Sequence, residues 1–357
     1  MEPLRHAIPA GHRQIRLSYV PLTDAAPLII AKEFGLFAER GLAVELVREP
    51  GWATVRDKLV HGREIHGAHA LAGLAFATSF GIQCIARHCV TGLILNRHGN
   101  GVTLSRELRR QGVREIADLN PGQLGRGGRR LRLGIVHPVS SHHYLLRTLF
   151  GRRGMKLSEQ AEVIVLPPEL MAKSLGRGMI DGFCVGEPWN SEAIENGTGF
   201  CFATSSELCD SHPEKVLLVT AEFAEERHDE HIALLGALIQ ACQLCDDLDQ
   251  RPEIARLLSS PAYLDLPLEI VQNSLCGRFH RGMRKYSPVE SIHAFSGEPV
   301  NRPSVEKANL VLATLRGSGL SADGGGASGR PATGAIFRDD LYEEACRHAG
   351  QAVALTS

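Results

Sequence analysis

The alternation of hydrophobic and polar positions near the start of the chain predicts a strand, a helix and a second strand. Residues 14–20 (QIRLSYV) alternate and stop at Pro21, as a half-buried strand does. Residues 26–34 (APLIIAKEF) have the pattern of a helix, with Thr23 or Asp24 as its cap. Residues 42–49 (LAVELVRE) follow as a strand. This order is typical of an α/β fold with a mostly parallel sheet.

The same pattern returns along the chain. It predicts helices over 52–62 and 71–80, a strand over 64–70, and sheet-like apolar segments over 82–90 and 91–96. A second series of strands and helices runs from residue 131 to about residue 204, and one more strand and mainly helices follow. Two such series with a helical return predict two lobes, joined by crossing segments and separated by a ligand cleft.

Composition and charge set the class of protein. The chain is 43% hydrophobic and 22% charged, which is ordinary for a globular protein, and its net charge is −1. No overall field therefore favours nucleic acid or a membrane, so any recognition of an anion must be local. The first residues show no signal-peptide pattern, and the nine cysteines form no disulfide framework, so we expect a cytoplasmic location. Residues 318–334 are rich in glycine and serine and predict a flexible loop.

Motifs of the common enzyme classes are missing from the sequence. It contains no phosphate-binding loop, no nucleophile elbow and no HExxH. Cys242 and Cys245 form a lone CxxC inside a helical pattern, where two core-facing side chains are a better interpretation than a metal site, because structural zinc takes four ligands. We expect no enzyme activity, no cofactor and no metal.

Hydrogen-bond donors and one cation stand at the junctions between predicted strands and helices. They are Trp52 after Gly51, Asn100 in the break HGNG, His142 in a serine-capped first turn, Trp189 beside Pro188 at a helix start, and Lys215 at the start of a strand. Helix N-termini attract anions, and neutral donors with a single cation suit a monoanion. Each side chain alone is explained at least as well by packing or capping, so the prediction of an anion site rests on the set.

Several longer segments resemble one family. They are GWATVRDKLVHGREIHGAHAL (51–71), LNRHGNGVTLS (95–105), SSHHYLLRTLF (140–150), VLPPELMAKSLGRGMIDGFCVGEPWNSEAIENGTG (165–199) and HPEKVLLVTAEF (212–223). With these segments the chain is similar, from about residue 14 onward, to the nitrate- and bicarbonate-binding branch of the solute-binding proteins of ABC transporters.

The resemblance implies a two-lobed clamshell of the type II periplasmic-binding-protein class, with a hinge. Lobe 1 would comprise residues 14–100 and 204–357, and lobe 2 residues 101–203. The anion contacts of the family would fall on Trp52, Asn100, His142, Pro188 with Trp189, and Lys215. Nitrate-binding members carry a glutamine where this chain has Asn100, which keeps the donor and shortens its reach. His143 is an alternative to His142.

Within the family, a chain without a leader resembles the cytoplasmic nitrate and nitrite sensors of the NasS-like branch. There, the anion-free protein holds an RNA-binding antiterminator of the ANTAR type (NasT-like), and anion binding releases it, so that nitrate-assimilation genes are transcribed. The resemblance thus implies nitrate or nitrite as ligand, no direct contact with nucleic acid and no membrane contact.

Other functions stay open beside the sensor. One is a binding protein that feeds a nitrate transporter. The bicarbonate branch is disfavoured, because it resembles a site built with an acidic residue and calcium, whereas Asn100 and Lys215 stand at the matched positions. A third is an enzyme like those of thiamine-pyrimidine synthesis, although their cysteine-rich motif is missing here. The last is an interaction protein with a vestigial cleft.

Overall fold

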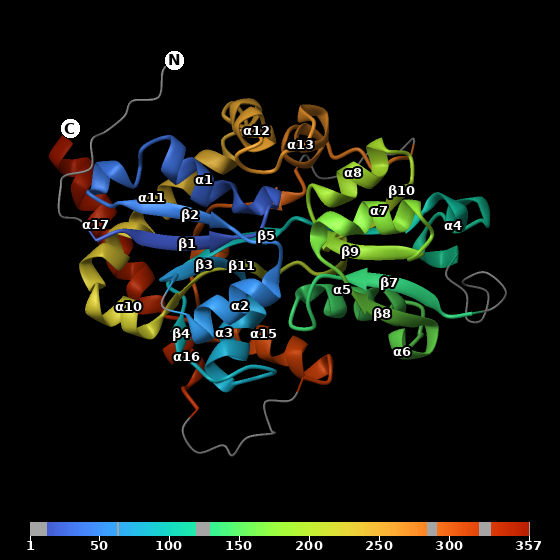
Figure 1. Cartoon of the computed structure of the whole chain (residues 1–357), viewed down its shortest axis with the longest axis horizontal. Helices are drawn as coiled ribbons and strands as arrows, with labels where there is room; N and C mark the ends of the chain where they lie inside the picture. The colour runs from blue at the N-terminus through green and yellow to red at the C-terminus, as the bar shows by residue number, and fades with distance from the viewer. Residues whose placement is uncertain (1–12, 63, 119–128, 284–290, 321–329, 357) are drawn as a thin grey trace.

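Two β-sheets, each flanked by helices, lie side by side along the longest axis of the molecule (Figure 1). The computed structural model describes residues 13–62, 64–118, 129–283, 291–320 and 330–356. The first sheet contains β1 (Ile15–Tyr19), β2 (Val44–Arg48), β3 (Gly67–Leu71), β4 (Cys89–Val90), β5 (Ile94–His98), β11 (Pro213–Thr220) and β12 (His293–Ala294). The second contains β6 (Asn100–Ser105), β7 (Leu131–Ile135), β8 (Ala161–Val165), β9 (Gly182–Gly186) and β10 (Gly199–Thr204). The α/β fold with two lobes agrees with the expectation from sequence.

Each sheet is mixed and has the same plan. The first has the order β12-β5-β11-β3-β1-β2, with β4 paired to β11, and the second has the order β10-β6-β9-β7-β8. In the first sheet β1 runs parallel to β2 and β3, while β11 runs antiparallel to β3 and β5. In the second, β7 runs parallel to β8 and β9, while β6 runs antiparallel to β9 and β10. The antiparallel strands are those beside the crossings between the sheets.

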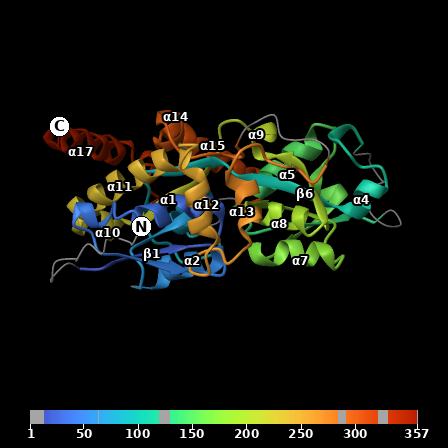
Figure 2. The same cartoon turned by 90° about the horizontal axis from the view of Figure 1, so that it is seen from above.

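Helices cover both sheets (Figures 1 and 2). Those of the first half are α1 (Ala26–Glu33), α2 (Trp52–His61), α3 (Ala72–Phe80), α4 (Arg106–Arg110), α5 (Ser141–Gly151), α6 (Leu157–Gln160), α7 (Met171–Gly176), α8 (Trp189–Glu195) and α9 (Ser205–Leu208). Those of the second half are α10 (Ala221–Glu226), α11 (His228–Asp246), α12 (Arg251–Ser259), α13 (Leu268–Leu275), α14 (Glu298–Asn301), α15 (Val305–Gly317), α16 (Thr333–Ile336) and α17 (Asp339–Thr356). Short 3-10 turns occur at η1 (Thr23–Ala25), η2 (Ala38–Arg40), η3 (Ile116–Asp118) and η5 (Pro168–Leu170).

Within the part of the chain that the structure describes, three segments run between the two lobes. β5 passes into β6 through the single residue Gly99, whose φ of 87° suits glycine. A side chain there would also clash with the ring of His293. The second crossing leads from α9 to β11. In the third, the stretch after α13 returns to the second sheet. There Arg281 donates to the carbonyl oxygens of Cys201 and Phe202 at 3.1 and 2.6 Å. The sequence did not indicate this third contact.

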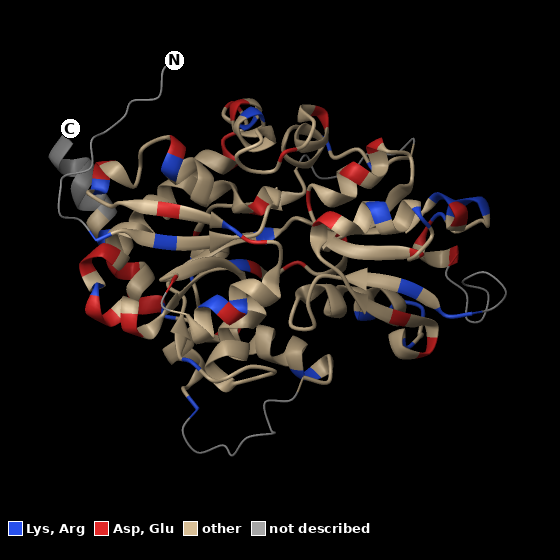
Figure 3. Ribbon diagram, in the orientation of Figure 1, with Lys and Arg blue, Asp and Glu red and all other residues tan. Residues whose placement is uncertain are grey.

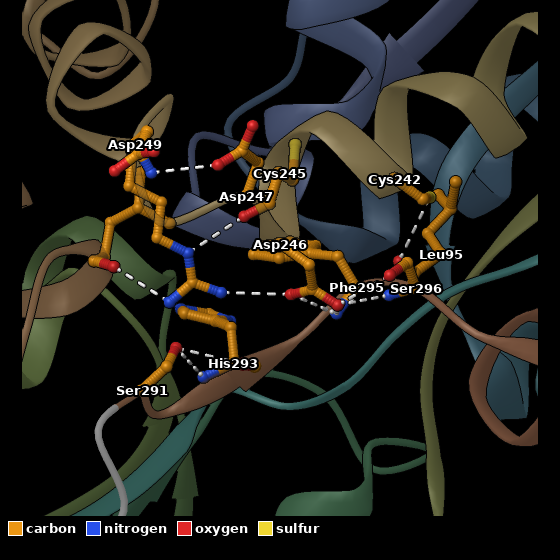
Figure 4. A network of polar contacts seen from close by, with 12 residues as sticks. Leu95, Cys242, Cys245, Asp246, Asp247, Asp249, Ser291, His293, Phe295 and Ser296 are labelled. Carbon is orange, nitrogen blue, oxygen red and sulfur yellow. Dashed lines mark hydrogen bonds and ion pairs between the residues drawn. The ribbon is translucent and has the colours of Figure 1, made fainter.

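A buried polar network holds the return of the chain toward the first sheet (Figure 4). The Asp246 carboxylate at the end of α11 accepts hydrogen bonds from the backbone N–H groups of Phe295 and Ser296 at 3.1 and 2.7 Å. It also pairs with Arg251 at 3.0 Å. A carboxylate that accepts several N–H groups fixes a loop firmly, because each bond is assisted by charge. This network positions β12, and with it His293, beside the crossing at Gly99.

Three expectations about local structure are wrong. The first turn of α5 has no serine side-chain cap, because the Ser140 hydroxyl donates to the His137 carbonyl and the Ser141 hydroxyl to Glu214. The apolar segment 82–90 forms a strand only at Cys89–Val90, since Gly81 ends α3 in the left-handed conformation and Ile85 is exposed. Thr23 and Asp24 do not cap α1: the helix begins after Ala25 without a side-chain cap. The Thr23 hydroxyl instead lies 2.8 Å from the Ser274 hydroxyl. The predicted loop 318–334 lies mostly outside the described residues.

Cys242 and Cys245 are both fully buried in the apolar core on α11, as the helical pattern predicts. Among the described residues, no group of three or more His, Cys, Asp or Glu is arranged to hold a metal ion. Within the same residues, none of the helices has both the length and the apolar character of a membrane span.

Close packing between the lobes depends on a glycine in α3. A Cβ on Gly73 would clash with the carbonyl oxygen of Val139, which belongs to the loop before α5. We expect Gly73→Ala to destabilise the protein by roughly 1–3 kcal/mol through overpacking. Gly236→Ala in α11 is the control, because a Cβ there meets nothing closer than Arg40 at 3.7 Å. It should be neutral or stabilise by up to about 1 kcal/mol through helix propensity. Urea unfolding measures both, and equal effects would contradict the packing argument.

Candidate ligand-binding site

The residues predicted from sequence converge where the two sheets meet. Trp52 opens α2 and Lys215 lies near the start of β11, both beside the first sheet, whereas Asn100 opens β6 and His142 lies in the first turn of α5, beside the second. Pro188 and Trp189 stand at the start of α8. All six are buried, so the lobes are closed over them. The geometry therefore joins side chains from both lobes in one enclosed place.

Lys215 forms the centre of this cluster. Its ammonium nitrogen lies 2.8 Å from Asp24 Oδ2 and 3.0 Å from Glu214 Oε1, and its side chain is only 1% exposed. Neighbouring residues of a regular strand point to opposite faces. Glu214 and Lys215 nevertheless meet, because the register of β11 against β5 shifts on both sides of Lys215. Such a bulge re-aims a side chain. The Asn96 side chain accepts the backbone N–H of Lys215 at 3.2 Å and so holds the bulge.

Asp24 reaches Lys215 from the turn after β1. The second lobe pins this turn, because the backbone N–H of Thr23 donates to the Glu187 carbonyl at 2.8 Å. Asp24 is fully buried, and its Oδ1 lies 3.0 Å from Nε2 of His69 on β3. The carboxylate is therefore enclosed by a lysine on one side and a histidine on the other.

A chain of hydrogen bonds leads from Glu214 into the second lobe. The Ser141 hydroxyl donates to Glu214 Oε2 at 2.6 Å, and the Asn100 amide donates to Ser141 Oγ at 3.3 Å. Asn100 Oδ1 in turn lies 3.1 Å from His142 Nε2, while His142 Nδ1 makes no hydrogen bond with a described residue. The predicted boundary puts Asn100 in lobe 1, yet Asn100 opens β6 of the second sheet. Since Glu214 lies on the first sheet and the other three residues lie beside the second, the chain couples the site to lobe closure.

The two tryptophans have different roles. The indole N–H of Trp52 is buried and has no partner among the described residues, and its ring lies 5.6 Å from the Lys215 ammonium. A buried donor without a partner costs free energy unless something fills the position. The indole N–H of Trp189 donates to the Pro21 carbonyl at 3.1 Å across the lobes. The Trp189 N–H, which could otherwise donate to a ligand, is thus used in a contact between the lobes. The peptide bond between Glu187 and Pro188, just before it, is cis.

Burial and mutual pairing set the charges of the site. Burial, the largest single effect, raises the pKa of Asp24 and Glu214, but Lys215, the neighbouring histidines and hydrogen bonds together outweigh it, so that the pKa of Asp24 falls below its usual range and that of Glu214 falls to about 2. Burial lowers the pKa of His142 to about 4, and it also lowers the pKa of His69. At neutral pH two carboxylates, one ammonium and neutral histidines therefore give this cluster one net negative charge.

This charge corrects the expectation of a single free cation. The sequence predicts Lys215 as the cation for an anion, yet two carboxylates already compensate it. Sequence reasoning missed Asp24, His69, Ser141 and Glu214 as parts of the site. Asp24 was read as a helix cap, and the only signal for Glu214 was its place next to Lys215 in the motif HPEKVL.

Two α/β lobes closed over a buried polar cluster define a solute-binding fold of the periplasmic-binding-protein type. The structure of the periplasmic nitrate-binding protein NrtA from Synechocystis matches it with a TM-score of 0.87 and 25% sequence identity, over 94% of this chain and 88% of that one. The model of the NMT1-like family matches residues 9–259. The chain belongs to the NMT1-like family.

Curated relatives come from both nitrate and bicarbonate systems. The nitrate import ATP-binding protein NrtC of Synechocystis is 34% identical over 94% of this chain and 50% of its own length. The bicarbonate transport ATP-binding protein CmpC of Synechocystis is 38% identical over 81% of this chain and 44% of its own. The nitrate/nitrite-binding protein NrtA of Synechococcus elongatus is 31% identical over 75% of this chain and 63% of its own. The chain thus spans about half the length of the first two.

The ion cluster makes a stability prediction. Lys215→Met leaves Asp24 and Glu214 buried without their counter-ion, which should cost about 3–5 kcal/mol of unfolding free energy. Lys156→Met is the control: that lysine is 79% exposed and pairs with Glu159, so its loss should cost less than about 1 kcal/mol. Urea unfolding at neutral pH measures both.

The pH dependence separates a charge effect from a packing effect. The deficit of Lys215→Met should shrink as the pH is lowered, because protonation of the two carboxylates removes the charge that the lysine compensated. A deficit that stays constant with pH would contradict the electrostatic explanation.

Proposed function

We propose that this protein binds nitrate or nitrite between its lobes and does no chemistry on the ion. The observation that carries the proposal is the unpartnered indole N–H of Trp52 beside the Lys215 ammonium, fully enclosed between two lobes. A donor and a cation in a buried site suit a planar anion whose oxygens only accept hydrogen bonds. The six positions Trp52, Asn100, His142, Pro188, Trp189 and Lys215 form our proposed binding site.

Similarity supports the same ligand. The relatives named for nitrate include NrtA, whose solved structure shares the fold of this chain over nearly its whole length. Charges of both signs are spread over the surface of the chain, with acidic residues on α10 and basic residues on α4 at opposite ends (Figure 3). Since no general positive field gathers anions, the enclosed donors must provide the recognition.

Bicarbonate is a second candidate because of one observation. Asp24 and Glu214 lie within 3.0 Å of Lys215, so an anion at the lysine also meets two carboxylates. Bicarbonate carries an O–H that donates to a carboxylate, whereas nitrate has no such donor. The similarity to relatives named for bicarbonate transport supports bicarbonate as the alternative ligand. Competition between the two anions in one calorimetric titration distinguishes them.

For the output of binding we propose a sensor. In this proposal the protein acts in the cytoplasm, where the ligand-free form holds an ANTAR-type antiterminator protein and the closed, anion-bound form releases it. The interlobe contacts of Ser141 and Trp189 support a large difference between open and closed states. A ligand shifts such an equilibrium only through its different affinities for the two states. Delivery of the anion to a nitrate transporter has equal support from the relatives.

Trp52→Phe tests the site. The change replaces the buried indole with a smaller phenyl ring, which should cost some stability through the cavity that it leaves. It also removes the N–H that has no partner among the described residues, so the Kd for nitrate should rise roughly 10- to 150-fold, as expected for one hydrogen bond to a charged group. Isothermal titration calorimetry measures the Kd. Tyr19→Phe is the matched control, since that buried hydroxyl only makes a 3.4 Å contact with the Ala262 carbonyl. Unchanged binding in Trp52→Phe, or no binding of nitrate and nitrite by the natural chain, would refute the proposal.

The output is tested with the ANTAR-type protein of the same genome. We expect the tagged chain to retain it without nitrate and to release it when nitrate saturates the site. Trp52→Phe should retain it at the same nitrate concentration, because its site is then largely empty. Size-exclusion chromatography of the mixture measures the complex. If instead the nitrate-bound chain binds the membrane subunits of a nitrate transporter and ignores the ANTAR-type protein, the transport alternative holds.

A further inference from the structure

The hydrogen-bond chain between the lobes has a fixed direction. Ionised Glu214 only accepts hydrogen bonds, so the Ser141 hydroxyl must donate its single proton to the Glu214 carboxylate, at an O···O distance of 2.6 Å. Ser141 Oγ is then an acceptor toward Asn100, which must present its NH2 group there, at 3.3 Å. The other end of the same amide, Oδ1, therefore faces His142 Nε2 at 3.1 Å. Each donor in the chain fixes the next group, beginning at the carboxylate.

This direction decides the tautomer of His142. Because Asn100 Oδ1 only accepts, Nε2 of His142 must carry a proton. A neutral imidazole has one N–H, so Nδ1 then carries no proton and can only accept a hydrogen bond through its lone pair. Nδ1 is buried and makes no hydrogen bond with any described residue, and Nε2 is already engaged. The nitrogen left for a ligand is thus an acceptor, which repels the oxygen of an anion.

The charge of the site acts in the same direction. Asp24 and Glu214 together carry two negative charges against the one positive charge of Lys215. An arriving monoanion would therefore make the net charge of this buried cluster more negative, from −1 to −2. Buried charge without compensation is costly. Neither carboxylate has a route to solvent in this arrangement, since the side chains of Asp24 and Glu214 are 0% and 4% exposed. A proton that arrives with the anion removes both problems.

We propose that anion binding is coupled to the uptake of one proton, which His142 accepts at Nδ1. The proposal rests on the anion site proposed above. Protonation turns the lone pair into a donor for the anion and adds a positive charge opposite the two carboxylates. The groups that face His142 are Asn100 on β6, Glu214 and Lys215 on β11, and Asp24 in the turn after β1. No bond to the anion forms or breaks, and the solvent supplies the proton.

Calorimetry in several buffers measures the coupling. Nitrate is titrated near neutral pH in Tris, imidazole and bis-Tris, whose charged forms are cations and do not compete for the site. The observed enthalpy should change linearly with the ionisation enthalpy of the buffer, with a slope that corresponds to about one proton taken up. The affinity should also fall about tenfold per pH unit between the pKa of His142 in the free protein and its higher pKa in the complex, and level off above the latter, because only in that range does binding take up the proton.

Two variants and a spectrum test the assignment to His142. His142→Gln should bind more weakly and with a slope near zero. Ser141→Ala frees the amide of Asn100 to turn over, so that a neutral His142 donates through Nδ1; we expect it to bind with little proton uptake. His69→Gln is the control, and it should keep the slope, although His69 also faces a carboxylate. Long-range ¹H–¹⁵N spectra should show the Nε2–H tautomer in the free protein and the imidazolium in the complex.

The outcomes separate this inference from the proposed function. A slope near zero in the natural chain, with clear binding, overturns the inference and leaves the anion site standing. Persistence of the slope in His142→Gln also overturns it, because the proton then goes elsewhere; loss of the slope in His69→Gln would identify that residue as the acceptor. Absence of binding of nitrate, nitrite and bicarbonate by equilibrium dialysis refutes the anion site itself.

Discussion

The pairing of Lys215 with Asp24 and Glu214 is the interaction on which the rest of this site depends. A lysine with 1% exposure stays charged only because two carboxylates lie within 3.0 Å of it, and burial would neutralise it otherwise. One carboxylate comes from the turn after β1, and a bulge in β11 brings the other. The bulge, the pinned turn and the closure of the lobes over both are therefore parts of a single electrostatic arrangement.

Much of the fold was readable from sequence because its elements are locally determined. β1, α1, β2, α2 and α3 follow apolar periodicity, and the structure has them within a few residues of the predicted bounds. The failures occurred where tertiary contacts override the local pattern. Residues 82–90 are apolar in sequence, yet Gly81 ends α3 there and Arg87 is held by the carbonyls of Leu59 and Gly62. No property of that segment alone indicates these partners.

The site was predictable only in part, for a similar reason. Trp52, His142 and Lys215 were found because donors at helix starts and a cation at a strand start have a local signature. Asp24 has the same local signature as a helix cap, and its true partners, Lys215 and His69, are distant in sequence. The sequence therefore predicts donors and a cation at this place, but not the net charge of the cluster that the structure shows. That charge is a property of the sheet order, which places β11 beside β3 and β5.

The same arrangement explains how a small ion can influence a whole clamshell. Glu214 pairs with the lysine on one side and accepts the Ser141 hydroxyl of the other lobe on its second side, at 2.6 Å. An anion that draws on the charge of Lys215 must change the electrostatic environment of Glu214, and with it a contact across the lobes. Trp189 adds a second contact across the lobes through Pro21. In the proposed site, recognition and closure would therefore share Lys215, Glu214 and Ser141, so that binding of an ion would also act on the contacts between the lobes.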